Sequence, residues 1–281
     1  MTEAIDPEAA RRVKLLATDL DGTLLVDHHV MSPRVLAAVA AAQDAGIEVA
    51  VATGRQVRHL PPSIAHGPLR YAVATNGAVA TRLDTGEVLF AEHIPTPVLR
   101  RLVSFIKERF PQVAFAAFQR GGEHWVAEAG YRQLVAEEDF YKDSPQYHVG
   151  PLEQLWAEPA VKLAARHPDV DPEDMLAALN GSGLSGFHAT TSGAPFIEIG
   201  PADVTKATGV GRLAGILGLS RDEVAGAGDA KNDIELIRWA GVGVAMGNSL
   251  PEVMDAADVV TADVAEDGIA VFLEALLAAR R

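Results

Sequence analysis

Two aspartates stand two positions apart at the end of an apolar segment of the chain. Asp19 and Asp21 follow residues 13–18, which we expect to form a buried strand, and Gly22 ends that strand. Side chains two apart on a strand point to the same face, so these carboxylates would lie close together. Two such charges repel, and a cation or a proton between them relieves the repulsion. An ordinary turn also uses Asp and Gly, so this segment alone leaves a structural role open.

Three further segments carry polar or charged residues where a predicted strand ends or a predicted helix begins. They are Thr53-Gly54-Arg55, Lys206, and Gly228-Asp229-Ala230-Lys231-Asn232-Asp233. In an open α/β sheet, binding and catalysis gather outside the carboxyl ends of the strands. We therefore expect these segments to lie beside the two aspartates in the folded chain.

The residue types in these segments suit the transfer of a phosphoryl group. Asp19, Asp21 and Asp229 offer carboxylate oxygens, which Mg²⁺ binds together with water and substrate phosphate. One carboxylate can attack phosphorus and form an aspartyl-phosphate, while another gives a proton to the leaving oxygen and later takes one from water. The hydroxyl of Thr53 and the ammonium of Lys206 suit phosphate oxygens.

The order of predicted elements favours a Rossmann-like α/β fold, a doubly wound parallel sheet with helices on both faces. Strand-like and helix-like segments alternate near both ends of the chain. Ser32 and Pro33 mark one helix start as N-cap and first helical residue. The predicted elements are strand 13–18, helix 34–45, strands 47–52 and 71–74, a hairpin over 81–90, strand 196–199, helix 206–217, strand 224–227, helix 232–239, strands 242–245 and 258–261, and helix 268–279.

The middle of the chain mixes helices and strands without that alternation, which is typical of a separate α+β module. Its predicted helices are 98–109, 153–157 and 172–180, and its predicted strands are 113–118, 124–127, 161–165 and 186–190. We therefore expect a core α/β domain formed by residues 1–92 and 192–281, interrupted by an inserted α+β cap domain over residues 93–191.

The composition excludes several classes of protein. Hydrophobic residues make up 48% of the 281, enough for a full globular core. The 24 lysines and arginines against 38 aspartates and glutamates give a formal charge of −14, which disfavours nucleic-acid and anionic-membrane partners. Without cysteine the chain can form no disulfide, thiolate nucleophile or cysteine-ligated zinc site. The acidic amino terminus lacks the apolar core of a signal peptide, and no apolar run reaches the ~18 residues of a membrane span, so we expect a cytoplasmic protein.

The charged segments resemble the four motifs of the haloacid dehalogenase (HAD) superfamily. The resemblance rests on Asp19-x-Asp21-Gly22-Thr23, a strand-end Thr53, Lys206, and Gly228-Asp229-x-x-Asn232-Asp233. It is closest to the Cof-type phosphatases, which carry a large α/β cap (a C2 or IIB cap) after the third strand. Thr75-Asn76-Gly77-Ala78 extends the resemblance, although Asn76-Gly77 could equally be a plain turn.

The resemblance implies a role for each matching residue. Asp19 would be the nucleophile and a metal ligand, and Asp21 would be the general acid and base and a metal ligand through its backbone carbonyl. Asp229 would complete the metal ligands, and Asp233 would orient the water ligands of the metal or Lys206. The phosphoryl group would be held by Thr53, Gly54, Lys206 and Asn232.

These expectations combine into a Mg²⁺-dependent phosphatase that acts on small phosphorylated metabolites through an aspartyl-phosphate. Sugar phosphates and phosphorylated cofactors are the expected substrate classes. The alternatives are a phosphosugar mutase and a non-catalytic protein that binds phosphorylated metabolites, and the intact set of acids disfavours the second. Arg55 could bind substrate or form an ion pair that holds its loop, and the sequence leaves this choice open, as it does the oligomeric state.

Overall fold

The computed structural model describes residues 5–27, 29–135 and 147–280, and contacts divide the chain into two compact units. The first unit comprises Met1–Arg55, Leu60–Leu89 and Thr205–Arg281, and the second comprises Gln56–His59 and Phe90–Val204. The first residues of the acidic amino terminus lie outside the described residues.

The first unit contains an eight-stranded sheet. In spatial order its strands are β14 (Val259–Val260), β13 (Val242–Ala245), β12 (Val224–Gly228), β1 (Leu15–Thr18), β2 (Glu48–Ala52), β3 (Tyr71–Ala74), β4 (Val79–Arg82) and β5 (Glu87–Ala91). The strands from β14 to β3 pair in parallel, and β4 pairs antiparallel with β3. The chain winds outward from β1 in one direction and from β12 in the other, so the strand order reverses between these two neighbours.

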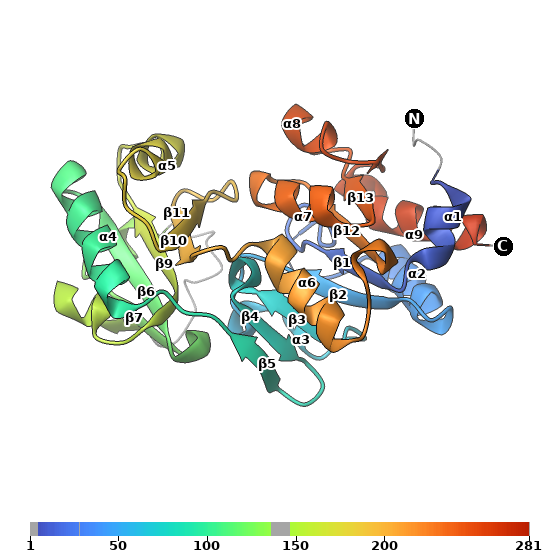
Figure 1. Ribbon diagram of the computed structural model, residues 1–281, viewed down its shortest axis with the longest axis horizontal. Coiled ribbons are helices and arrows are strands. Elements are labelled where there is room, and N and C mark those ends of the chain that lie inside the picture. The colour runs from blue at the N-terminus through green and yellow to red at the C-terminus, as the bar shows by residue number, and fades with distance from the viewer. Residues whose placement is uncertain (1–4, 28, 136–146, 281) are drawn as a thin grey trace. The chain divides into compact units, whose positions relative to one another are not determined.

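Helices cover both faces of this sheet, as the predicted α/β fold requires (Figure 1). Helices α6 and α7 contact each other in front of the sheet in this view, and α2 and α9 contact each other behind it. The helices of this unit are α1 (Pro7–Arg12), α2 (Pro33–Asp44), α3 (Pro62–Ala65), α6 (Lys206–Ile216), α7 (Ile234–Trp239), α8 (Pro251–Met254) and α9 (Gly268–Ala279). Ser32 caps α2 as predicted, because its side chain accepts a hydrogen bond from the Val35 N–H.

The second unit has a six-stranded sheet of its own. In spatial order its strands are β10 (Phe187–Thr190), β11 (Ile197–Pro201), β9 (Ala160–Arg166), β6 (Ala114–Gln119), β7 (His124–Ala127) and β8 (Tyr147–Val149). The pairings are antiparallel except for that between β7 and β8.

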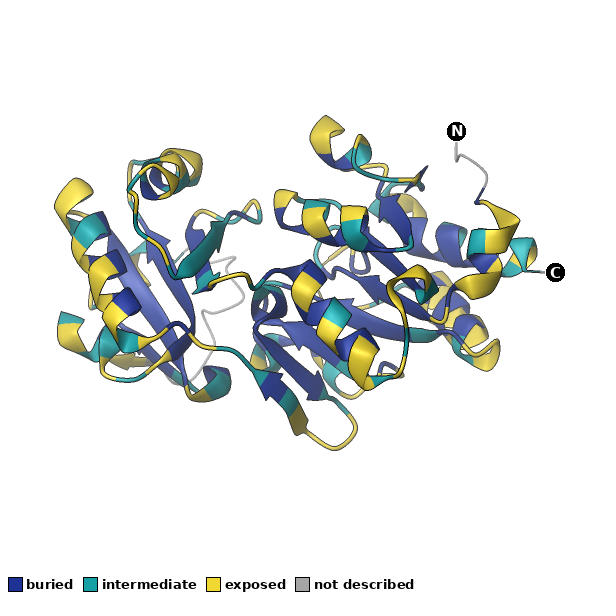
Figure 2. Cartoon of the chain, viewed as in Figure 1, coloured by how far each residue is buried: buried dark blue, intermediate teal, exposed yellow. Residues whose placement is uncertain are grey.

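Two helices, α4 (Thr96–Arg109) and α5 (Pro172–Asn180), give the second unit its core. Leu99, Leu102 and Ile106 recur at helical spacing on α4 and pack in one buried cluster with Phe115 and Leu163 of the sheet. Figure 2 shows this burial along the strands of both units. The second unit is therefore an α+β module with its own hydrophobic core.

The predicted cap boundaries at residues 93 and 191 differ from the observed unit. The predicted core domain includes residues 196–199, because the alternation of strands and helices resumes after them, but β11 belongs to the six-stranded sheet. Ile197–Ile199 pairs with β9, and β11 also pairs along its length with β10. The second unit consequently extends to Val204, and it also includes Gln56–His59.

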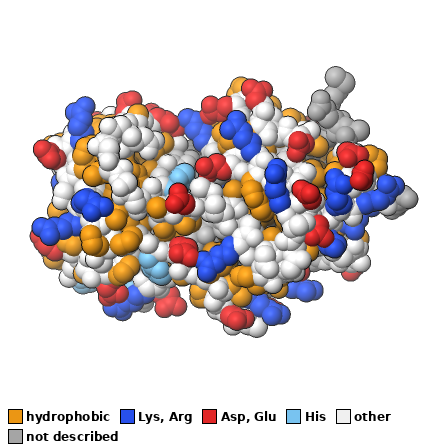
Figure 3. All heavy atoms as spheres, viewed as in Figure 1, with side chains coloured by type: hydrophobic (Ala, Val, Ile, Leu, Met, Phe, Trp, Pro, Cys, Tyr) orange, Lys and Arg blue, Asp and Glu red, His pale blue; other side chains and the backbone are white. Residues whose placement is uncertain are grey.

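Among the described residues, no helix has the length and apolarity needed to cross a membrane. Acidic and basic side chains are interspersed over the face shown in Figure 3. On that face the acid excess of the sequence is spread out rather than gathered into one patch.

Candidate active site

The predicted acids lie at the carboxyl ends of neighbouring strands in the first unit. Asp19 and Asp21 follow β1, Thr53 follows β2, and Asp229 follows β12. The Asp19 N–H donates to the Ala227 carbonyl at 2.9 Å, which continues the pairing of β1 with β12. The site therefore forms where the strand order reverses, the position at which open α/β sheets bind ligands.

A tight turn after β1 brings the first motif against Asp229. Gly22 has a φ of +78°, and a Cβ at this position would lie 2.6 Å from Asp229 Oδ2, so only glycine fits. The next residue, Thr23, donates its hydroxyl hydrogen to Asp229 Oδ1 at 2.5 Å. Asn248 donates to the Gly22 carbonyl at 2.9 Å. The turn thus fixes one oxygen of Asp229.

Lys206 lies between two carboxylates at the first residue of α6. Its Nζ is 2.8 Å from Asp19 Oδ1 and donates to Asp233 Oδ1 at 2.6 Å. The second oxygen of Asp233 accepts from the N–H groups of Asp229 and Ala230, at 3.1 and 3.0 Å. Asp233 therefore ties the lysine to the loop that carries Asp229, and with both oxygens engaged it can orient its neighbours.

Burial and close charges shift the ionisation of this cluster. Burial raises the pKa of the Asp19 carboxyl well above its ordinary value, against the opposing effect of Lys206. Burial also raises the pKa of Asp229 to about 6, although the Thr23 hydroxyl donates to it. For Lys206, burial favours the neutral amine, but Asp19 and Asp233 outweigh it and raise the pKa above its ordinary value. The lysine is a permanent cation at neutral pH.

Three acids of the described residues are close enough to hold one metal ion. Ligand atoms of Asp19, Asp229 and Asp233 all lie within 4.8 Å of one another. This group differs from the predicted set, because the Asp21 carboxylate faces Arg55 instead. The predicted metal contact of Asp21 uses its backbone carbonyl, and that contact stays a prediction.

The segment after β2 is held by the turn that follows β3. The Arg55 N–H donates to Thr53 Oγ1 at 3.1 Å, so the Thr53 hydroxyl keeps its own hydrogen for another acceptor. The N–H groups of Thr75 and Asn76 donate to the carbonyls of Arg55 and Thr53, at 2.8 and 3.0 Å. Gly54 lies between these fixed positions, where the sequence predicts a phosphate-binding backbone.

Asn76 is more than a turn residue, because its side chain reaches Asn232. The Asn232 amide donates to Asn76 Oδ1 at 3.0 Å, and no described residue donates to the buried Asn232 Oδ1. Thr75 and Asn76 adopt φ values of +56° and +51°, which are uncommon for residues with a side chain. The next residue is Gly77, where a Cβ would lie 2.0 Å from the Thr205 carbonyl. This left-handed turn therefore packs against the start of α6.

Arg55 forms an ion pair with Asp21, which is one of the two contacts that the sequence left open for it. Its Nε donates to Asp21 Oδ2 at 2.7 Å, and its Nη2 donates to Asp21 Oδ1. The ion pair joins the ends of β1 and β2 within the first unit. Both oxygens of the predicted general acid are engaged by this one guanidinium.

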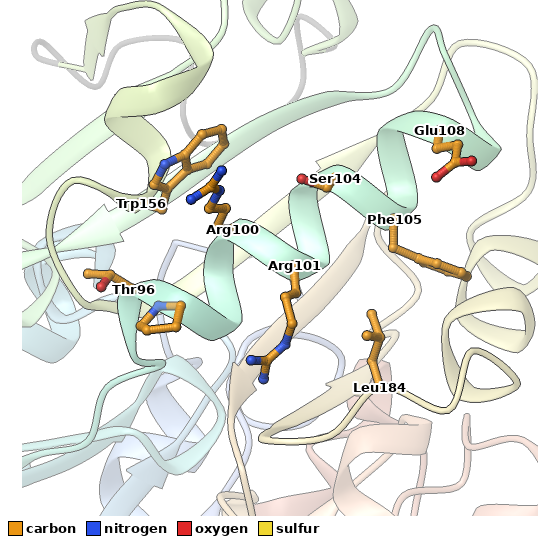
Figure 4. Close-up of a pocket in the computed structure, with 9 residues that line it drawn as sticks. Thr96, Arg100, Arg101, Ser104, Phe105, Glu108, Trp156 and Leu184 are labelled. Carbon is orange, nitrogen blue, oxygen red and sulfur yellow. The ribbon is translucent and has the colours of Figure 1, made fainter.

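A pocket of about 700 Å³ lies elsewhere, along α4 in the second unit (Figure 4). Arg100 and Arg101 project from the helix there, and Trp156 and Leu184 contribute from other segments. None of the predicted site residues lines it. We therefore place the chemistry at the strand ends of the first unit.

The structure brings the predicted residues together in linked contacts. Lys206 joins Asp19 to Asp233, which in turn holds the Asp229 backbone. Sequence reasoning assigned no role to Thr23 or to the Asn76 side chain, and both touch predicted site residues. Each belongs to a quoted motif, so a systematic assignment of every polar residue in those motifs would have found them.

The sequence model of the haloacid dehalogenase-like hydrolases matches residues 16–273. The chain belongs to this family. The match to these hydrolases spans the strands that carry the site as well as the whole second unit, in agreement with the resemblance seen in the motifs.

Individual relatives agree with this membership. YxeH of Bacillus subtilis (strain 168) is 29% identical over 276 residues, which cover 95% of this chain and 99% of YxeH. The 5-amino-6-(5-phospho-D-ribitylamino)uracil phosphatase YitU of the same organism is 27% identical over 270 residues, covering 92% and 96%. The structure of the HAD phosphatase BT1666 from Bacteroides thetaiotaomicron matches with a TM-score of 0.77 and 28% identity, covering 94% and 95%. The protein is a phosphatase of the Cof type within the HAD family.

Proposed function

We propose that the protein is a cytoplasmic, Mg²⁺-dependent phosphatase that hydrolyses small phosphorylated metabolites through an aspartyl-phosphate on Asp19. The observation that carries the proposal is the buried contact of Asp19 with Lys206 beside Asp229. A carboxylate nucleophile beside a cation and a second acid is what phosphoryl transfer to an aspartate requires.

The charges of the cluster suit a divalent cation. When all four are ionised, Asp19, Asp21, Asp229 and Asp233 would carry four negative charges against the two positive charges of Lys206 and Arg55. A divalent ion would balance the remainder, and oxygen donors are the ligands Mg²⁺ prefers. Asp19 and Asp229 would hold it with the predicted Asp21 carbonyl, since both oxygens of Asp233 are engaged. When bound, the ion offsets carboxylate repulsion and draws electron density from the phosphoryl oxygens.

The side chains then divide the reaction into two displacements. In the first, an Asp19 oxygen forms a bond to phosphorus, the bond from phosphorus to the leaving oxygen breaks, and Asp21 gives that oxygen a proton. In the second, water attacks phosphorus and yields a proton to Asp21, while the bond to Asp19 breaks and phosphate is released. Lys206, Thr53 and Asn232 would hold the phosphoryl oxygens throughout.

The proposed substrates are sugar phosphates or phosphorylated cofactors. By its name, YitU acts on a uracil compound that carries a phosphorylated ribityl chain, which is a small phosphorylated metabolite. The similarity to YitU supports this class of substrate for the chain and no single compound.

Phosphate release from 4-nitrophenyl phosphate and a panel of phosphorylated metabolites tests the proposal. Release should require Mg²⁺, stop on addition of a chelator, and be lost in Asp19→Asn, while rapid acid quenching should trap phosphate on the wild-type chain. Asp84→Asn, in the exposed turn between β4 and β5, is the matched control and should keep full activity. Activity retained by Asp19→Asn would contradict the mechanism, and isomer exchange without net phosphate release would identify a mutase.

A further inference from the structure

The guanidinium of Arg55 holds the Asp21 carboxylate at two points. Nε donates to Oδ2 at 2.7 Å, and Nη2 donates to Oδ1. A two-point contact between planar groups fixes the plane of the carboxylate as well as its distance. The Arg55 side chain is only 6% exposed, whereas that of Asp21 is 31% exposed. The arginine is thus the buried partner, and the acid is the partner that reaches solvent.

The backbone on both sides of this pair is also held. The Arg55 N–H donates to Thr53 Oγ1 at 3.1 Å, and its carbonyl accepts from the Thr75 N–H at 2.8 Å. On the other side, the turn that carries Asp21 closes when the Leu25 N–H donates to the Leu20 carbonyl at 2.8 Å. The guanidinium can therefore act as a rigid reference for the carboxylate.

We propose that Arg55 is a positioning residue that orients the Asp21 carboxyl group for its two proton transfers. The inference rests on the proposed function, in which Asp21 gives a proton to the leaving oxygen and later takes one from water. Arg55 keeps its own protons in both steps, because a guanidinium does not release one at working pH. On this proposal its effect on the reaction passes through the orientation of Asp21.

Two other roles for Arg55 make different predictions. An arginine that bound substrate would direct its N–H groups to the ligand, and its loss would weaken phosphate binding. An ion pair that only held the loop would need a charge without the fork geometry, so a lysine would replace it fully. Positioning needs the two-point contact, so Arg55→Lys should rescue Arg55→Met only in part.

The leaving group separates these roles in a kinetic experiment. Values of kcat/KM for 4-nitrophenyl phosphate and for an alkyl phosphate report the first displacement, and only the alkoxide needs a proton in order to leave. Asp21→Asn should therefore lower kcat/KM for the alkyl phosphate by about 10²- to 10⁴-fold, and much less for the nitrophenyl ester. Arg55→Met should show the same selectivity with a loss of roughly 10- to 100-fold. The inhibition constant for inorganic phosphate should stay unchanged.

A double-mutant cycle tests whether Arg55 acts through Asp21. Once Asp21→Asn has removed the acid, adding Arg55→Met should cost no further activity toward the alkyl phosphate. The matched control is Arg34→Met, which breaks a two-point arginine–carboxylate pair with Glu274 on the surface of the same unit. This control should leave kcat/KM unchanged for both substrates.

Each remaining outcome overturns the inference. Equal losses of kcat/KM for both leaving groups in Arg55→Met would indicate a structural role. Weaker inhibition by phosphate would indicate that Arg55 binds substrate. Additive losses in the double-mutant cycle would show that Arg55 does not act through Asp21. If Arg55→Met does not fold, the activity of Arg55→Lys tests the proposal instead. Wild-type activity in Arg55→Lys would contradict a positioning role, because lysine cannot make the two-point contact. A lack of leaving-group dependence in Asp21→Asn would instead contradict the proposed function, so the two failures are distinguishable.

Discussion

Each unit of the molecule buries a lysine, and the two lysines meet different surroundings. In the second unit, Lys162 on β9 contacts Glu198 on the neighbouring β11, and its ammonium lies 5.9 and 5.4 Å from the ring centroids of Phe118 and Phe196. In the first unit, Lys206 contacts both Asp19 and Asp233. One lysine pairs with a carboxylate among aromatic faces in the middle of a sheet, and the other lies among several acids at strand ends.

The difference is the one that we expect between a structural ion pair and the proposed active site. A buried charge needs a partner, and the contact between Lys162 and Glu198 supplies one for each. The acids around Lys206 exceed the cations, and the proposed divalent ion would balance that excess. An excess of acids over cations thus distinguishes the proposed active site from the structural pair.

The largest effect should come from Asp19→Asn, which keeps the shape of the side chain and removes the proposed nucleophile. We expect kcat to fall by roughly 10⁴- to 10⁶-fold, as with the loss of other enzymatic nucleophiles. The metal-free variant should unfold at the same or a higher temperature, because burial disfavours the charged form of Asp19. Steady-state kinetics measures the fall in kcat, and a thermal melt measures the unfolding temperature. A large drop in melting temperature would mean that Asp19 stabilises the fold, as Glu198 is expected to do.

The pair of Lys162 and Glu198 should instead matter for stability. Glu198→Gln removes the carboxylate that Lys162 contacts, and we expect the free energy of unfolding to fall by about 3–5 kcal/mol. The double variant Lys162→Met with Glu198→Leu leaves no buried charge at these two positions and should recover most of the loss. Urea denaturation measures both, and a double variant as unstable as the single one would mean that the ion pair itself is required.

Mg²⁺ should stabilise the first unit through the excess acids. A ligand at 100 times its dissociation constant stabilises the state that binds it by about 2.7 kcal/mol, so saturating Mg²⁺ should raise the melting temperature measurably. Asp229→Asn should reduce that rise because it removes one of the proposed ligands. Asp84→Asn serves as the surface control. If Mg²⁺ raises the melting temperature of Asp229→Asn as much as that of the wild-type chain, Asp229 is not a metal ligand.

The smallest effect should be a slope of stability with pH in the metal-free protein. Because burial raises the pKa of Asp229 from 3.8 to about 6, the folded state holds its proton more tightly than the unfolded state. The stability from this group is present below pH 4 and is lost as the pH rises through 6. Urea denaturation at several pH values in a chelator should show a shallower loss over this range for Asp229→Asn. An identical slope in the variant would contradict the assignment.

The sequence predicted most elements because turn residues and caps bound them. Strands 71–74 and 124–127 match β3 and β7 residue for residue, and Ser32 placed the start of α2. The sequence could not assign residues 196–199 to the right sheet, because an apolar run indicates a strand without indicating its partner. Residues 147–149 form β8, which the sequence does not predict, because three residues are too few to show a period.

The sequence predicted that the candidate residues lie close together, but it could not predict which side chains contact each other. Motif spacing placed Asp19 and Asp229 at one edge of the sheet, because the ends of parallel strands meet there, and it placed Lys206 at the start of a helix. Which side chains touch depends on turns such as the one at Gly22, whose left-handed backbone directs Thr23 to Asp229. The pairing of Arg55 with Asp21 likewise depends on rotamers and loop shape that no sequence period encodes.

The pairing of β1 with β12 also sets an order of events during synthesis. Leu15 pairs with Val224, so this strand pair of the first unit cannot form until more than two hundred further residues have left the ribosome. The second unit is nearly continuous in sequence, from Phe90 to Val204, and the last strand of its sheet, β11, precedes β12 in the chain. A nascent chain can therefore carry a finished insert while the first unit still lacks its central partner, and chaperones would meet the two halves of that unit as separate exposed segments.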